Sequence, residues 1–235
     1  MSLPLFILYG SATGNASHIS KTLAATLQTT LSTSPYTEII CTNLDSYKKT
    51  CLPIWSQPPD PTSLTSKYPV IIICSTTGNG DSPENSQRFV RMIKKKPKDP
   101  TLPRLFQHCT FAVLGLGDTN YDKFCETAKI LDRSLDLHGG TRAQKLVCAD
   151  EATGLEDTVE PWIASIDKVM KEVGKRREEG GEVCGEVEKL GKEEGSEKGG
   201  DEVTKREGDD ELVSPRPGAM RGRGLPGDVE ALTRQ

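Results

Sequence analysis

The sequence lacks the usual marks of metal-binding, disulfide-bonded and membrane-spanning proteins. Its seven cysteines are odd in number and scattered, and none forms a C-x-x-C pair, which argues against a disulfide framework and a zinc site. No segment approaches the roughly 20 apolar residues that a membrane-spanning helix needs, and no basic region precedes the short apolar run near the N-terminus. We therefore expect a cytoplasmic protein without a metal site and with neither a membrane nor a nucleic acid as partner.

Aromatic residues are absent from the last quarter of the chain. From Lys171 onward the sequence has 17 acidic and 13 basic residues, 13 of the 22 glycines and no aromatic side chain. Such a segment cannot bury enough apolar surface to offset its chain entropy. We predict a folded domain over residues 1–172, followed by a disordered Glu/Lys/Gly-rich tail or truncated linker over 173–235.

Two common nucleotide-binding motifs, G-x-G-x-x-G and G-x-x-x-x-G-K-[ST], are also missing. The segment Leu5–Ala25 nevertheless changes from a strand pattern to a helical pattern across Gly10–Asn15. The N–H groups and the dipole at the start of a helix favour an anion. This turn therefore suggests a phosphate site, although an ordinary strand-to-helix turn explains this stretch alone equally well.

The rest of residues 1–172 alternates between strand and helix patterns. Beyond Leu5–Tyr9, we expect strands at Thr37–Thr42, Tyr68–Ser75, Thr110–Leu114 and Ala143–Cys148. Helices are expected at residues 16–27, from Asp81 or Ser82 to Lys95, from Phe124 to a stop at Gly139-Gly140 and from Thr158 or Pro161 to Val173. Trp55 lies in a connection and is expected to anchor packing. This alternation predicts an α/β fold, a doubly wound parallel sheet.

Three unusual loops follow the first, third and fourth predicted strands: Gly10–Asn15, Ser75–Asp81 and Gly115–Tyr121. In a parallel sheet they would meet at the carboxyl edge, where such folds bind ligands. The second and third loops are rich in glycine and lack paired nucleophiles and bases, which suits backbone contacts to a flat ring on which Tyr121 could stack. A phosphate and a planar ring together describe flavin mononucleotide (FMN).

The motifs S-A-T-G-N-A at 11–16, S-T-T-G-N-G-D at 75–81 and L-G-L-G-D-T-N-Y-D-K-F-C at 114–125 resemble the FMN-binding flavodoxin-like domain of the diflavin reductases. The resemblance covers about residues 4–172 and implies a five-stranded sheet of order 2-1-3-4-5. Thr77 and the segment A-D-E-A-T-G-L-E-D-T-V-E-P-W at 149–162 are most similar to the methionine synthase reductase group within that family.

The resemblance also implies a role for each loop. The first loop would hold the phosphate, the other two would line the isoalloxazine with Tyr121 stacked on it, and Asp150 or Glu151 would lie near the ribityl chain. Many relatives have Tyr where this chain has Thr77, so one ring face would be less shielded. The implied cofactor-binding residues are Ser11, Ala12, Thr13, Gly14, Asn15, Ala16, Ser75, Thr76, Thr77, Gly78, Asn79, Gly80, Leu114, Gly115, Leu116, Gly117, Asp118, Thr119, Asn120, Tyr121, Asp122, Lys123, Phe124, Cys125, Asp150 and Glu151.

The implied function is that of an oxidoreductase module without catalytic residues of its own. It would accept electrons from an FAD/NADPH module and pass them singly to a protein acceptor, methionine synthase first or an iron–sulfur assembly protein as the alternative. FAD and NADPH would bind only to a separate or missing module, so the isolated chain is expected to be inactive with NADPH.

Three hypotheses from other classes compete with the electron carrier. An FMN-dependent NAD(P)H:quinone reductase shares the fold, and an interaction protein could retain it without flavin. A phosphoacceptor receiver domain needs acidic residues where this chain has Cys74-Ser75 and Gly10-Ser11.

Overall fold

The computed structural model describes residues 3–34, 36–60, 62, 66–97 and 104–175 of the chain. The strands are β1 (Leu3–Gly10), β2 (Tyr36–Asn43), β3 (Tyr68–Ser75), β4 (Cys109–Gly117), β5 (Thr141–Arg142) and β6 (Val147–Asp150). The α-helices are α1 (Asn15–Thr29), α2 (Tyr47–Thr50), α3 (Leu52–Trp55), α4 (Gln87–Ile93), α5 (Glu126–Leu137) and α6 (Glu156–Lys175). Short 3-10 turns η1 (Leu31–Thr33), η2 (Leu44–Ser46) and η3 (Glu84–Ser86) complete the described elements.

The strands form one parallel sheet in the order β2-β1-β3-β4, with β5 and β6 both pairing with β4 at the last position. The predicted order 2-1-3-4-5 is therefore confirmed, but the fifth position is divided between two short strands. The predicted strand Ala143–Cys148 is confirmed only at Val147 and Cys148, which belong to β6, since residues 143–146 lie outside both strands. Arg142 binds Asp132 of α5 at 2.8 and 2.9 Å, and the Gln144 side chain donates to Ser165 of α6 at 3.1 Å. The segment between β5 and β6 is thus held by the contact of Gln144 with α6 and by the Ala143 N–H, which donates to Phe111 O of β4 at 2.7 Å.

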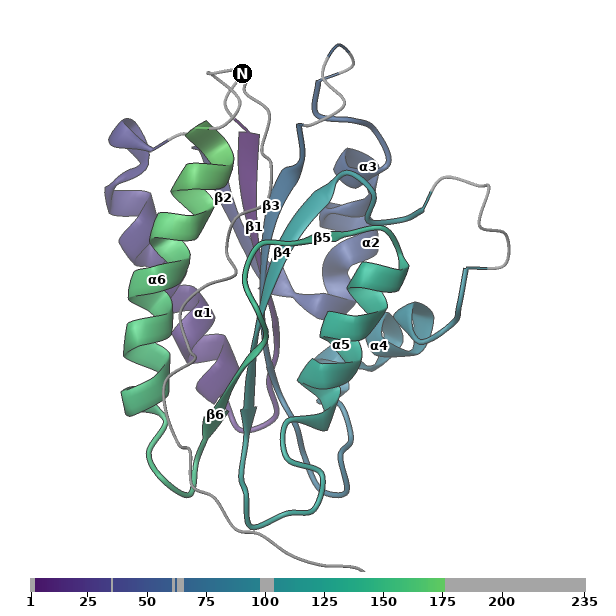
Figure 1. Cartoon of the computed structure of the whole chain (residues 1–235), viewed down its shortest axis with the longest axis vertical. Helices are drawn as coiled ribbons and strands as arrows, with labels where there is room; N and C mark the ends of the chain where they lie inside the picture. The colour runs from purple at the N-terminus through teal and green to yellow at the C-terminus, as the bar shows by residue number, and fades with distance from the viewer. Residues whose placement is uncertain (1–2, 35, 61, 63–65, 98–103, 176–235) are drawn as a thin grey trace, which may run out of the picture. The chain divides into compact units, whose positions relative to one another are not determined.

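Alternate residues of the central strands belong to two separate apolar cores. On one face of the sheet, Phe6 and Ile72 pack with side chains from α2, α3, α4 and α5. On the other face, Ile7 and Ile71 pack with side chains from α1 and α6. Figure 1 shows the two helix layers on opposite sides of the sheet. Burial on both faces explains why β3 is an uninterrupted apolar run rather than an alternating one.

Several helix boundaries differ from those predicted. Asp81 forms a bridge with Thr77, so the helical segment starts only at η3 and α4. Cys125 has a left-handed backbone with φ 52°, which delays the start of α5 to Glu126. The last helix begins at Glu156 and contains Pro161. Burial of Trp162 and Ile166 against the sheet favours this longer helix despite the proline.

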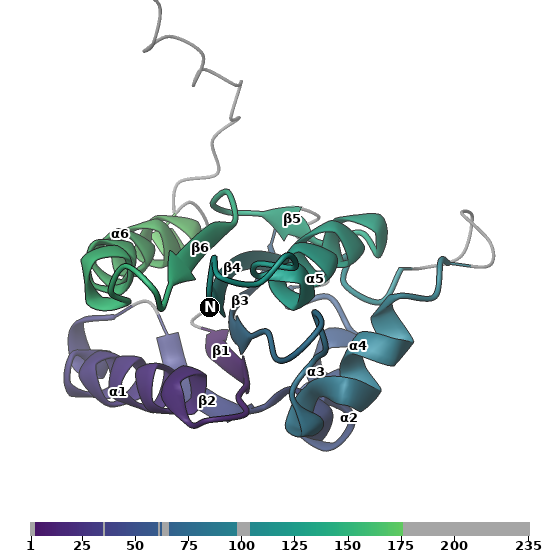
Figure 2. The same ribbon diagram turned by 90° about the horizontal axis from the view of Figure 1, so that it is seen from below.

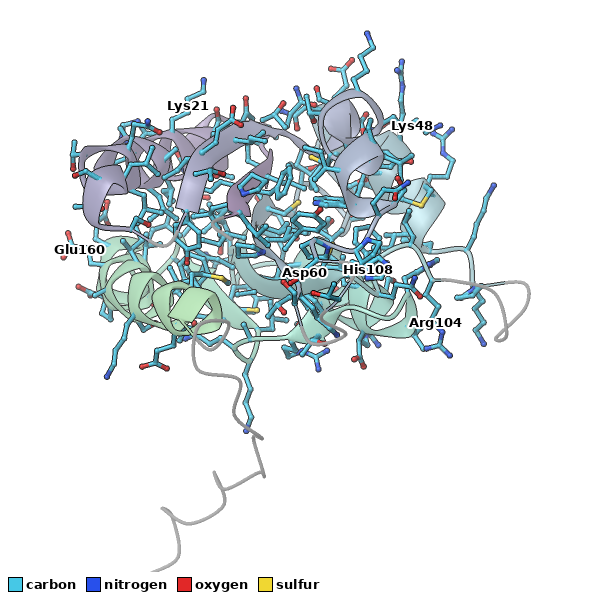
Figure 3. All side chains as sticks on the ribbon, turned by 90° about the horizontal axis from the view of Figure 1, so that it is seen from above. Lys21, Lys48, Asp60, Arg104, His108 and Glu160 are labelled. Carbon is cyan, nitrogen blue, oxygen red and sulfur yellow. The ribbon has the colours of Figure 1, made fainter. Side chains whose placement is uncertain are left out.

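Outward-facing charges cover the helices, while side chains fill the space between the sheet and both helix layers. Figure 3 shows Lys21 of α1, Lys48 of α2 and Glu160 of α6 pointing away from the sheet.

None of the helices within the described ranges is both long enough and apolar enough to cross a membrane. From residue 176 onward, the segment predicted as a disordered tail lies outside the described residues.

The core beneath α3 is aromatic. The Trp55 side chain is 1% exposed, and its ring centroid lies 5.3 Å from the rings of both Phe6 and Phe106. Trp55 therefore anchors the connection between β2 and β3 to the sheet, as expected from the sequence.

Replacing Trp55 with alanine should lower the free energy of unfolding by about 3–5 kcal/mol, because the change removes apolar contacts and leaves a cavity. Urea denaturation measures the difference. Leu137→Ala is the control, because Leu137 is 53% exposed and its loss should cost less than about 0.5 kcal/mol. Equal losses in the free energy of unfolding from the two changes would contradict the role of Trp55 as a packing anchor.

Candidate functional site

The loops after β1, β3, β4 and β6 lie at one edge of the sheet. Because all the strand pairs are parallel, these carboxyl ends share one side of the molecule. Figure 2 looks onto this edge and shows the loops around the ends of the central strands. The convergence expected from the sequence is therefore present.

The first loop is shaped by its own side chains and by a distant asparagine. Ser11 Oγ accepts a hydrogen bond from the Gly14 N–H at 3.1 Å, and the Ser11 N–H donates to Asn85 Oδ1 at 2.9 Å. Gly14 precedes α1 with φ 108°, a backbone conformation that residues with a side chain rarely adopt. Glycine is therefore required at this position for its backbone conformation. Lack of space is not the reason, since an added Cβ would meet no atom within 4 Å.

The N-terminus of α1 offers a row of free donors. The N–H groups of Ala12, Thr13, Asn15, Ala16 and Ser17 have no acceptor within the described part of the chain. The first turn of α1 carries no acidic side chain, and no side chain caps the helix. Converging N–H groups and the positive end of the helix dipole favour an anion here without a basic residue.

The second loop is a tight hairpin at the end of β3. Thr77 and Asp81 exchange backbone hydrogen bonds of 2.9 and 2.8 Å. The Thr76 N–H donates to Leu116 O at 2.9 Å, and Thr76 Oγ1 accepts from the Thr127 N–H at 3.2 Å. These bonds fix the hairpin against β4 and the start of α5.

The third loop presents an aromatic ring. Asp118 shapes the turn, because its carboxylate accepts from the Asn120 N–H at 2.8 Å and its carbonyl accepts from the Tyr121 N–H at 3.2 Å. Tyr121 is 60% exposed, one of two exposed large hydrophobic side chains among the described residues. Its exposed ring is available to stack on a ligand.

Asp150 joins the loop after β6 to the third loop. Its carboxylate accepts from Thr119 Oγ1 at 2.6 Å, from the Thr119 N–H at 3.0 Å and from the Ala152 N–H at 3.0 Å. The Thr119 hydroxyl is the main cause of a lowered Asp150 pKa. Glu151 instead accepts from Asn15 Nδ2 at 3.3 Å, which links this loop to the first one. Both acids thus hold loops together, Asp150 at the third loop and Glu151 at the first.

The loops enclose a cavity of about 240 Å³. Fourteen of the predicted residues line it: Ala12, Thr13, Asn15, Ser75, Thr76, Thr77, Gly78, Leu116, Gly117, Asp118, Tyr121, Lys123, Cys125 and Glu151. Tyr121 is the one aromatic residue among them. The cavity thus joins the donors of the first loop to an aromatic surface on the third.

The other twelve predicted residues lie outside the cavity lining: Ser11, Gly14, Ala16, Asn79, Gly80, Leu114, Gly115, Thr119, Asn120, Asp122, Phe124 and Asp150. Ala16 and Leu114 are fully buried in the core beneath α1 and α6. Gly115 has no side chain and so lets α5 pack closely against β4, because a Cβ at this position would lie only 2.6 Å from Ala128 Cβ. Several of these residues therefore support the cavity through packing in the core and do not line it.

Two residues of this region, Leu155 and Asn85, are not among the predicted site residues. Leu155 lines the cavity but follows the sixth strand outside any of the three motifs. Asn85 holds the first loop from 74 positions away, a separation that no local pattern reveals.

Within the described ranges, no group of three His, Cys, Asp or Glu side chains could hold a metal ion.

The Asp150 link should depend on pH. Because the folded pKa of Asp150 is lowered, its stabilising contribution is present above the ordinary value of 3.8 and is lost as the pH falls through the lowered pKa. NMR of the Thr119 amide should therefore show an acid transition below pH 3.8 that Asp150→Asn removes. A transition that persists in the variant would exclude Asp150 as its source.

Comparisons with known proteins agree with this architecture. The flavodoxin family model matches residues 7–162. Methionine synthase reductase from Bos taurus is 43% identical over 42% of this chain and 14% of its own length. NADPH-dependent diflavin oxidoreductase 1 from Bos taurus is 33% identical over 72% of this chain and 26% of its own length. This chain thus spans about a quarter or less of these relatives.

The fold also has a match among solved structures. A cysteine-to-alanine mutant of the flavodoxin from Pseudomonas aeruginosa superposes with a TM-score of 0.50 and 20% identity, over 72% of this chain and 99% of the flavodoxin. With the family model covering about two thirds of the sequence, the chain belongs to the flavodoxin family and is related to the diflavin reductases.

Proposed function

We propose that the carboxyl-edge cavity binds FMN. The observation that carries this proposal is one cavity bounded by free amide donors at the start of α1 and by the exposed ring of Tyr121. The donors suit a phosphate monoester, and the ring suits a planar heterocycle. Membership of the flavodoxin family supports the same cofactor.

The loops have different tasks in this proposal. The first loop binds the phosphate through backbone N–H groups, and Ser11 keeps the Gly14 turn in place. The second and third loops orient the ring, with Tyr121 covering one of its faces. The cavity lining has Thr77 and no second aromatic residue, so the other face is shielded less.

The bound flavin would supply one-electron transfer, and the protein would hold and orient it. We propose that the chain receives electrons from an FAD/NADPH module and delivers them to methionine synthase. The 43% identity to methionine synthase reductase supports this acceptor. The longer match to NADPH-dependent diflavin oxidoreductase 1 supports another diflavin reductase, for which an iron–sulfur assembly protein is the second candidate acceptor.

Flavin titration tests the cofactor. Apoprotein should bind FMN one to one and much more tightly than FAD, because a helix N-terminus suits a terminal phosphate monoester better than a bridged diphosphate. Isothermal titration with each flavin measures the affinities. Equal affinities, or binding of neither flavin, would refute the FMN assignment.

Two substitutions should separate the ends of the cavity. Tyr121→Ala should weaken both FMN and riboflavin binding, by about 0.5–1.5 kcal/mol beyond lost burial, because stacking is lost. Gly14→Val should weaken FMN binding and leave riboflavin binding unchanged, because valine cannot adopt the φ of 108° without strain of about 1–3 kcal/mol. Fluorescence titration measures both, with Leu137→Ala as control. The opposite pattern would mean that the ligand lies in the reverse direction.

The identity of the electron acceptor is tested in an assay that combines the chain with a separate FAD/NADPH module and a candidate acceptor. Supplied with a separate FAD/NADPH module, the chain should support NADPH-driven reactivation of methionine synthase. Without that module it should leave NADPH unoxidised. Stopped-flow absorbance under anaerobic conditions follows both reactions. Electron delivery to an iron–sulfur assembly protein but not to methionine synthase would favour the second acceptor.

A further inference from the structure

Cys125, which lines the carboxyl-edge cavity, lies close to Cys148 of β6. Cys148 of β6 pairs in register with Gly115 of β4, and parallel neighbours in register direct their side chains to the same face of a sheet. A Cβ on Gly115 would lie 3.2 Å from Cys125 Cβ and 3.3 Å from Cys125 Sγ. The absence of a side chain at Gly115 thus lets the Cys125 thiol occupy the space beside Cys148.

Contacts of the sulfur atoms agree with this placement. Cys125 Sγ lies 3.9 Å from the carbonyl oxygen of Ala149, the residue that follows Cys148. Interaction between the two thiols is the largest cause of a raised Cys125 pKa and of a lowered Cys148 pKa. Lys129 lowers the Cys148 pKa further, against burial and the Asp132 carboxylate, which raise it. Cys148 is therefore the thiol more readily ionised.

Exposure separates the roles of the two thiols. Cys125 is fully buried, whereas Cys148 is only half-buried and can be reached from solvent. A second neighbouring pair, Cys51 and Cys109, is buried and has raised pKa values, so its thiols should resist oxidation.

We propose that Cys125 and Cys148 form a dithiol site that hydrogen peroxide oxidises to an intramolecular disulfide. The proposal stands on the strand register and sulfur contacts and does not depend on FMN binding.

The chemistry proceeds in two balanced steps. The Cys148 thiolate attacks one peroxide oxygen, the O–O bond breaks, and Cys148 sulfenic acid and hydroxide form. The Cys125 sulfur then attacks the sulfenic sulfur, its proton leaves with the hydroxyl group as water, and an S–S bond forms. Peroxide is reduced by two electrons, which the two thiols supply.

Peptide mapping of the whole folded chain tests the site. The chain carries Cys184→Ser in every protein, so that this further thiol does not contribute. After peroxide treatment, alkylation in denaturant should find four free thiols instead of six. Trypsin should release the peptide 124–129 joined to the peptide 146–168.

Three variants identify the order of reaction. Cys125→Ser should stop at a sulfenic acid on Cys148, which dimedone traps, and Cys148→Ser should give no joined peptide. Cys41→Ser is the matched control, because Cys41 is also half-buried but has a pKa raised by burial, and the joined peptide should persist. Cys148 should react at least about tenfold faster than Cys41.

The result for the chain that carries Cys184→Ser alone is decisive even if a further variant folds poorly, and circular dichroism checks each fold. Six alkylated thiols after peroxide treatment of the folded chain would overturn the proposal. Faster modification of Cys41 than of Cys148, or joined peptides only between two chains, would overturn it as well.

Discussion

The unpaired N–H groups at the start of α1 are the constraint on which the site depends. A helix N-terminus leaves its first donors without partners, and this chain places no acidic side chain in the first turn to satisfy them. The loop geometry keeps these donors together, since Ser11 and Asn85 hold the turn before Gly14. An anion at this point satisfies donors that the protein leaves free.

The parallel sheet brings the other parts of the site to the same place. Every strand pair is parallel, so the loop after β3 and the loop after β4 lie beside the loop after β1. The two cores make this edge stiff, because the central strands are buried on both faces. Asp150 and Glu151 then link the loop after β6 to its neighbours. The ring of Tyr121 is exposed on a firmly held loop.

The strands and helices that could be predicted from the sequence are those with a clear local pattern of apolar residues. The change from strand to helix periodicity located β1 and α1, and the long apolar run gave β3 with its correct bounds. The divided last strand escaped prediction, because the contact of Arg142 with Asp132 depends on tertiary packing. The left-handed conformation of Cys125 and the hydrogen bond of Asn85 also depend on distant neighbours. Motifs therefore predicted the loops that line the cavity better than the residues that support them.

A site shared by the three loops predicts one localised response to ligand. Amide NMR of the labelled chain during FMN addition measures it directly. The largest shifts should fall on Ala12 to Ser17, on Gly78 and on Tyr121. A second cavity of about 520 Å³ lies between α1 and α6 and includes Ile19 and Ile163. Shifts confined to that groove, with the first-loop amides unchanged, would contradict the account.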